Sequence, residues 1–132
     1  MSYDSTTSVP ENKGERGIIK QVDLTDSDTF PYTIWIPPEN KKVVVDDILL
    51  TLREASGNRA IFNLEIRKAG QWETMMQIAQ VGNGVAMFGH GFIGKISSEI
   101  GNGTAPKVRV HKPITANTTN FTLKVLVIGR NV

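Results

Sequence analysis

The stretch Phe121-Thr122-Leu123-Lys124-Val125-Leu126-Val127-Ile128-Gly129 decides the fold class of this chain of 132 residues. Its apolar side chains recur at every second position, which is the period of an extended strand with one buried face. The residues of that face are Phe121, Leu123, Val125 and Val127. The opposite face begins polar, with Thr122 and Lys124, and turns apolar at Leu126 and Ile128. We therefore predict a strand that is covered on one side throughout and on both sides at its far end.

Two earlier segments, residues 41–54 and 61–68, show the same alternation. The first could also be written as one or two helical turns, but the alternation of Ile48, Leu50 and Leu52 against Asp47, Thr51 and Arg53 favours a strand. In the second, Phe62, Leu64 and Ile66 are predicted to face inward. Because Ser56-Gly57-Asn58 supplies turn residues between the two segments, we predict that they form a hairpin.

The most aromatic segment spans residues 30–36, between Phe30 and the pair Pro37-Pro38. Strict alternation places Phe30, Tyr32, Ile34 and Ile36 on one face and directs Trp35 away from it. Proline cannot donate a hydrogen bond to a ladder, so Pro31 indicates a strand at a sheet edge. This direction leaves three alternatives for Trp35: the second face of a buried sheet, a subunit or partner interface, or a site where the indole stacks on a sugar.

Shorter segments complete the pattern. A strand opens at residues 17–22 and ends in acidic turn residues, another follows the turn Ala69-Gly70-Gln71, and a third covers residues 107–111. The glycine-rich stretch 82–94 favours bulged strands and loops over helix. We predict an all-β, antiparallel two-sheet β-sandwich or jelly roll of seven to eight strands over residues 17–132. Residues 1–16 are almost without apolar side chains, so we expect a flexible or partner-docked arm.

Composition excludes several classes of function. The net charge is only +2 and the basic residues are scattered, so we predict no nucleic-acid partner. Apolar runs long enough to span a membrane and an N-terminal signal are both lacking, so we expect neither membrane insertion nor secretion. The chain has no cysteine, which removes disulfides, thiol nucleophiles and cysteine-bound zinc.

The string GHGFIGKI at residues 89–96 satisfies G-x-G-x-x-G and nearly satisfies the phosphate-loop pattern. A phosphate loop needs a hydroxyl directly after its lysine, but Ile96 follows Lys95, and Ser97 comes one residue too late. The segment that follows is too short and too rich in glycine to form the required helix. We therefore interpret this string as a bulged strand or loop and predict no bound cofactor.

Metal and catalytic motifs are lacking as well. His90 and His111 have no metal-ligand spacing, and Asp46-Asp47 lies in no calcium-loop pattern. Neither a nucleophile elbow nor another recognisable serine motif occurs. We predict no catalytic residues, no metal and no enzyme activity, although a carboxylate pair that meets only in space stays a minor alternative.

Four segments carry a resemblance to a known class of protein: VDLTD (22–26), TFPYTIWIP (29–37), VVVDDI (43–48) and LKVLVIG (123–129). In their layout over residues 17–132 the chain resembles small accessory proteins of tailed-bacteriophage particles, and the nearest are head decoration, or cement, proteins. The resemblance implies a homo-oligomer, with a trimer as the expected state, that binds the major capsid protein across subunit joints on the phage head. It also implies synthesis in the host cytoplasm.

The expected partner contacts are aromatic or lie in the arm, and we name Tyr3, Pro10, Phe30, Tyr32, Trp35 and Trp72. For Met75, Met76, Met87 and Phe88 we expect core packing. A carbohydrate-binding module of a tail fibre or baseplate is the alternative function, because exposed aromatic rings also stack on sugars.

Overall fold

The computed structural model describes residues 14, 16–35, 42–68, 70–89, 98–101, 108–113 and 120–131. All of their regular structure is β-strand. The strands are β1 (Arg16–Thr25), β2 (Tyr32–Trp35), β3 (Lys42–Glu54), β4 (Arg59–Lys68), β5 (Gln71–Val81), β6 (Gly84–Gly89), β7 (Ser98–Gly101), β8 (Val108–His111) and β9 (Phe121–Asn131). None of the described segments is a helix with the length and hydropathy needed to span a membrane.

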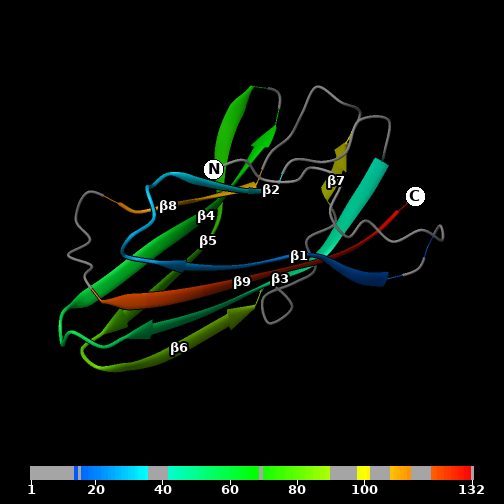
Figure 1. Cartoon of the computed structure of the whole chain (residues 1–132). Helices are drawn as coiled ribbons and strands as arrows, with labels where there is room; N and C mark the ends of the chain where they lie inside the picture. The colour runs from blue at the N-terminus through cyan, green and yellow to red at the C-terminus, as the bar shows by residue number, and fades with distance from the viewer. Residues whose placement is uncertain are drawn as a thin grey trace.

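The strands form two antiparallel sheets, seen in Figure 1. Sheet A has the order β1-β9-β3-β6, and the short β7 also pairs with β3. Sheet B has the order β2-β8-β4-β5. Apart from the β4–β5 hairpin and β7, consecutive strands lie in opposite sheets, which is the connectivity of a double-sheet jelly roll. The predicted all-β sandwich is confirmed.

The predicted hairpin between residues 41–54 and 61–68 is wrong. β3 belongs to sheet A and pairs with β9, β6 and β7, whereas β4 belongs to sheet B and pairs with β5 and β8. Alternation identifies the inward face of a strand but not its neighbour, so two successive strands can face each other across a core. The hairpin of this region joins β4 to β5 and contains Gly70 at a φ of 80°, a left-handed conformation that favours glycine.

The core lies between the sheets and follows the predicted inward faces. Sheet A contributes apolar side chains from β3 and β9, among them Ile48, Leu50, Leu52, Phe121, Leu123, Val125 and Val127. Sheet B contributes Phe62, Leu64 and Ile66 from β4, together with Val108 and Val110 from β8. Because both sheets place their apolar face on this common interior, burial stabilises them jointly.

β2 departs from strict alternation, and this overturns the prediction for Trp35. The register with β8 shifts between Thr33 and Trp35, so two consecutive residues, Ile34 and Trp35, both turn into the core. Trp35 is 0% exposed, and the expectation that its indole points away from the core is wrong. A bulge of this kind changes the facing of every later residue in a strand. The edge position indicated by Pro31 is confirmed, because β2 is the last strand of sheet B.

Candidate functional site

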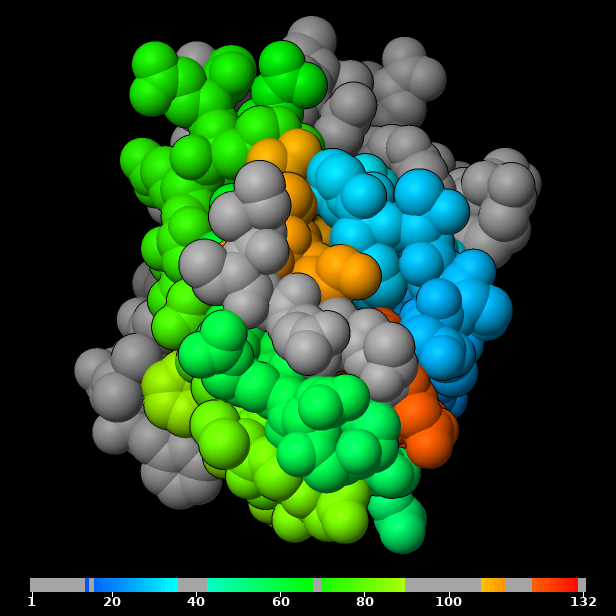
Figure 2. Space-filling view, turned by 90° about the vertical axis from the view of Figure 1, so that its left-hand side faces the viewer, coloured from blue at the N-terminus to red at the C-terminus, as the bar shows by residue number. Residues whose placement is uncertain are grey.

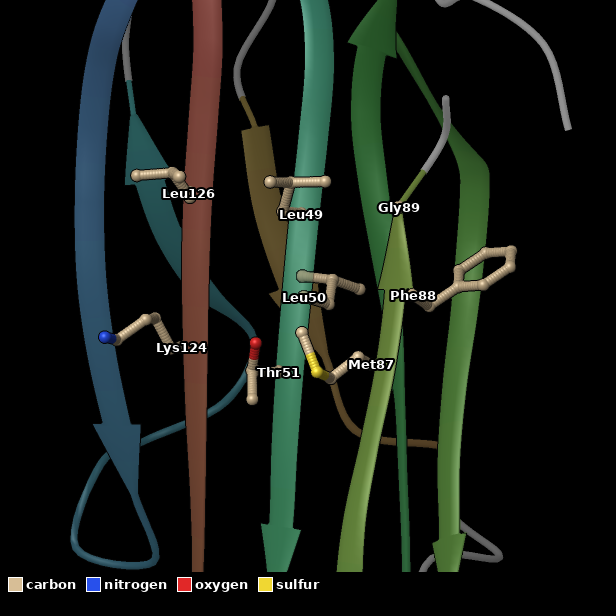
Figure 3. A pocket seen from close by; sticks show the side chains of 8 residues that line it. All are labelled: Leu49, Leu50, Thr51, Met87, Phe88, Gly89, Lys124 and Leu126. Carbon is tan, nitrogen blue, oxygen red and sulfur yellow. The ribbon is translucent and has the colours of Figure 1, made fainter. Parts of the chain in front are cut away.

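A groove crosses the outer face of sheet A, and we call it the sheet A groove. Its lining comes from three strands that are distant along the chain: Leu49, Leu50 and Thr51 of β3, Met87, Phe88 and Gly89 of β6, and Lys124 and Leu126 of β9. Its volume is about 420 Å³. Figure 3 shows these residues spread across the three neighbouring strands.

The strand register explains why the groove forms at this point. Leu49 lies opposite Leu126 on one side and opposite Gly89 on the other. Gly89 has no side chain, so the row of apolar residues stops there and leaves a depression beside Leu49. In the next row Thr51 lies between Lys124 and Met87.

The groove is apolar and open to solvent. Met87 is 75% exposed and Leu49 is 39% exposed, while Lys124 is the one charged residue of the lining. Apart from Lys124 and the Thr51 hydroxyl, the lining consists of apolar residues and Gly89. It can accept apolar side chains of another molecule, because covering Met87 and Leu49 removes apolar surface from water.

Exposed apolar residues continue beyond the groove on the same face. Ile18 of β1 is 53% exposed and lies opposite Ile128 of β9, and Val85 of β6 is 54% exposed. The sequence carried part of this signal, since Leu126 and Ile128 break the polar pattern of their face. Leu49 is also apolar at a position where the alternation of its strand calls for a polar residue, and the prediction missed it. The expectation of core packing is wrong for Met87, whereas Phe88 is half-buried.

The outer face of sheet B has a different character. Glu65 of β4 accepts a hydrogen bond from Arg109 Nε of β8 at 2.7 Å. The same guanidinium stacks on Trp72 of β5, with its carbon 3.8 Å from the ring centroid. Thr74 Oγ1 donates to the other Glu65 oxygen at 3.5 Å. These four residues form a polar cluster around one half-buried indole, and we call it the Trp72 cluster.

The other expected contacts do not gather in one place. Tyr3 and Pro10 lie outside the described residues. Phe30 is half-buried and packs on Phe62 and Phe121, at centroid distances of 5.4 and 6.0 Å.

Tyr32 is half-buried on β2, at the opposite edge of sheet B from Trp72. Partial burial, and after it the carboxylate of Asp28, raises the pKa of Tyr32 above its ordinary value. Trp35 cannot touch a partner from the core.

The charged side chains that were considered for metal binding pair with arginines instead. Asp46 is buried and lies 3.4 Å from Arg130 Nε and 4.0 Å from Arg16 Nε, and Asp47 forms an ion pair with Arg16. Among the described residues no three His, Cys, Asp or Glu side chains gather as metal ligands. Residues 90–97, which include His90 and all of the string GHGFIGKI after Gly89, lie outside the described residues.

Fold and surfaces together define an all-β jelly-roll domain with an apolar groove on one sheet and a polar, aromatic cluster on the other. No protein-family model matches the sequence, and no curated protein matches it. Among solved structures, the chain is similar to an acetyl xylan esterase, Est2A, from the rumen bacterium Butyrivibrio proteoclasticus, with 14% identity and a TM-score of 0.36. That alignment covers 89% of this chain and 34% of the esterase, so the chain spans about a third of that protein.

Proposed function

We propose that this chain is a non-enzymatic structural protein of a phage particle, a decoration protein that binds the major capsid protein on the head surface. The phage assignment rests on the layout of the sequence. The sheet A groove is the single structural observation that carries the binding role, because it is an open apolar surface on a β-sheet. No cofactor enters this proposal.

The proposed occupant of the groove is an apolar segment of the major capsid protein. Burying a methionine or leucine side chain stabilises a contact by about 1.5–3 kcal/mol, so Met87 and Leu49 alone supply a moderate affinity. A moderate contact becomes strong when several copies act together on a symmetric shell, since each further contact forms at high effective concentration. The arm with Tyr3 and Pro10 is proposed as an additional contact.

Co-sedimentation with capsid shells that lack the decoration protein tests this function. Met87→Lys places a charge in the groove, and we expect at least a tenfold loss of shell binding. Thr29→Lys adds the same charge on an exposed loop far from the groove in sequence, and binding should be unchanged. Deletion of residues 1–13 removes Tyr3 and Pro10 without entering β1 and should weaken binding further. Full binding by Met87→Lys and Leu49→Lys would show that the groove is not the contact.

The Trp72 cluster supports a second candidate function, a carbohydrate-binding module of a tail fibre or baseplate. Sugars stack on aromatic faces and hydrogen-bond to carboxylates and guanidinium groups, and this cluster offers all three. One face of the indole already carries Arg109, so a sugar has to use the remaining surface of the ring.

Calorimetric titration with bacterial surface glycans separates the two functions. A glycan that binds the wild type and Met87→Lys equally, but not Trp72→Ala, would favour the carbohydrate-binding function. Shell binding that survives in Trp72→Ala and is lost in Met87→Lys would favour the decoration function.

A further inference from the structure

The flank of the sandwich where β5 and β6 run side by side adjoins the sheet A groove, because β6 borders both. β5 is the outermost described strand of sheet B, and β6 is the outermost strand of sheet A on the same side. Figure 2 shows the green and yellow-green atoms of this flank on the left and the blue atoms of β1 and β2 on the right. β5 pairs with β4 alone, and no second strand among the described residues pairs with its outer edge.

This edge lacks the usual protection against pairing with another chain. Natural edge strands carry lysines, prolines or other charges that prevent such pairing. Residues 71–89, which span both strands, contain one charged residue, Glu73, and no proline. β1 at the opposite edge of sheet A carries Arg16, Lys20 and Asp23, and β2 at the opposite edge of sheet B has four residues and follows Pro31.

A bulge narrows the segment that can pair. The register of β5 with β4 shifts at Met75, because Glu65 lies opposite Thr74 while Leu64 lies opposite Met76. The remaining six residues of β5, MQIAQV at positions 76–81, have no charge, glycine or proline. Gln77, Ala79 and Val81 are exposed on their outer face, and Val81 is 74% exposed. An uncharged six-residue segment of this kind pairs readily with a copy of itself.

We propose that β5 pairs with β5 of a second copy of this chain, antiparallel and around a two-fold axis close to Ala79. The pairing joins two copies of sheet B into one continuous sheet. With the axis at Ala79, Gln77 of each copy lies opposite Val81 of the other, and outward residues stay outward. Glu73 then has no opposite residue within β5 of the second copy, so the pairing brings no like charges together.

A second copy suits this edge because the pairing segment is complementary to itself. Around an axis at Ala79, residues 77–81 of the two copies lie opposite one another, which is about 17 Å of each strand at about 3.4 Å per residue. With two layers about 20 Å deep, the contact covers about 340 Å² per chain, so the backbone hydrogen bonds of the new ladder rather than the buried area have to supply most of the affinity. An isologous contact also closes on itself, so the paired edge cannot add further copies and aggregate.

This inference replaces the expected trimer by a dimer and does not depend on the phage assignment. In the dimer two copies of the sheet A groove are carried by one rigid body. Loss of the dimer and loss of shell binding are separate results, because the native mass is measured without any shell.

The test uses the full chain and its native mass, by light scattering or mass spectrometry at micromolar concentration. We expect twice the 14.5 kDa of one chain for the wild type. Ala79→Lys places a charge at the proposed axis, and we expect dimerisation to weaken at least tenfold while the circular dichroism spectrum is retained. Gln21→Lys, at an exposed site of β1 on the opposite flank, should stay dimeric. Met87→Lys should stay dimeric as well.

A cysteine variant tests the geometry independently of any destabilisation. The chain has no cysteine, so Ala79→Cys introduces the single thiol. Opposite residues of an antiparallel pair have Cα atoms about 4.5–5.5 Å apart, within the range of a disulfide, so mild oxidation should give a covalent dimer. Gln21→Cys should stay uncrosslinked. A monomeric wild type, an assembly that Ala79→Lys leaves intact, or an Ala79→Cys variant that does not crosslink would each overturn the proposal.

Discussion

The guanidinium carbon of Arg109 lies 3.8 Å from the centroid of the Trp72 ring. Arg109 belongs to β8 and Trp72 to β5, so the contact reaches across β4, which lies between these strands. Glu65 of β4 sits below it and accepts the Arg109 Nε hydrogen at 2.7 Å. The Arg109 side chain of β8 thus contacts both β4 and β5 on the outer face of sheet B.

Arg109→Ala should lower the free energy of unfolding by about 2 kcal/mol, because it removes the stacking on Trp72 and leaves the nearly buried Glu65 carboxylate without its cation. Solvent screening keeps the loss below that of a fully buried pair, since the Arg109 side chain is 21% exposed. Urea denaturation measures the change. Arg53→Ala, at an exposed site of β3, should stay within about 0.5 kcal/mol of the wild type. Equal losses in the two variants would contradict the role of the cluster.

Much of the fold could be predicted because apolar residues recur at every second position in several segments of the sequence. The inward faces of β3, β4 and β9 follow directly from alternation, and their residues are buried as predicted. The pairing of strands could not be predicted in this way. β3 is followed by β4, yet it lies beside β9, which comes about 70 residues later, and alternation holds no information on that partner.

The candidate sites were harder to predict for the same reason. The sheet A groove combines Leu49, Met87 and Leu126, which only the register of sheet A brings together. The contact of Arg109 with Trp72 likewise depends on the order of sheet B, and neither residue carries a motif. For Trp35 the failure is local, since a bulge in β2 shifts the phase within four residues.

Trp35 should behave as a core residue in solution. The chain has two tryptophans, so Trp72→Phe leaves Trp35 as the one fluorophore of its kind. We expect blue-shifted emission that acrylamide quenches poorly, because the indole is 0% exposed. Quenching as efficient as that of free tryptophan would contradict the burial.

Truncation of the same side chain tests its energetic role. Trp35→Ala should lower the free energy of unfolding by about 3–5 kcal/mol through lost burial and the cavity left behind. Trp35→Phe should cost markedly less, because Nε1 has no hydrogen-bond partner among the described residues and the phenyl ring removes this unsatisfied donor. Urea denaturation of both variants gives the comparison, and an equal cost would mean that Nε1 does have a partner.

Glu54 at the end of β3 should make stability depend on acid pH. Burial by itself raises the pKa of Glu54, but hydrogen bonds from Ser56 and from the amides of Gly57 and Asn58 outweigh it and lower the pKa below its ordinary value of 4.5. Ser56 Oγ donates to the two carboxylate oxygens at 2.7 and 2.8 Å. A carboxyl with a lowered folded pKa stabilises the fold above its unfolded pKa, and that stabilisation is lost as the pH falls through the folded value.

Glu54→Gln should therefore be less stable than the wild type at neutral pH, and the difference should shrink as the pH falls below about 4. Urea denaturation over a pH series measures both curves. Glu73→Gln, at an exposed position of β5, serves as the control and should follow the wild type throughout. A constant difference between Glu54→Gln and the wild type at all pH values would show that ionisation of Glu54 is not involved.

Gly129 of β9 lies at a position of sheet A where a side chain has no room. Its neighbours are Gly17 of β1 and Val45 of β3, and both flanking strands shift register at this level. A Cβ atom built on Gly129 would collide with the carbonyl oxygen of Val44 and with Ile19 Cδ1. The Ile19 side chain can rotate, whereas the carbonyl belongs to the backbone of β3 and cannot move without disturbing the ladder.

Gly129→Ala should therefore lower the free energy of unfolding by about 2 kcal/mol, as overpacking commonly does. The double variant Gly129→Ala with Ile19→Val removes the collision with Cδ1 but leaves the carbonyl, so it should recover none of the loss caused by Gly129→Ala. Thr122→Ala on the exposed face of β9 is the control and should change little. Urea denaturation gives the stability of the double variant relative to Ile19→Val alone. If the double variant is as stable as Ile19→Val, the collision that matters is the one with Ile19 Cδ1, and the Val44 carbonyl is not the cause of the loss.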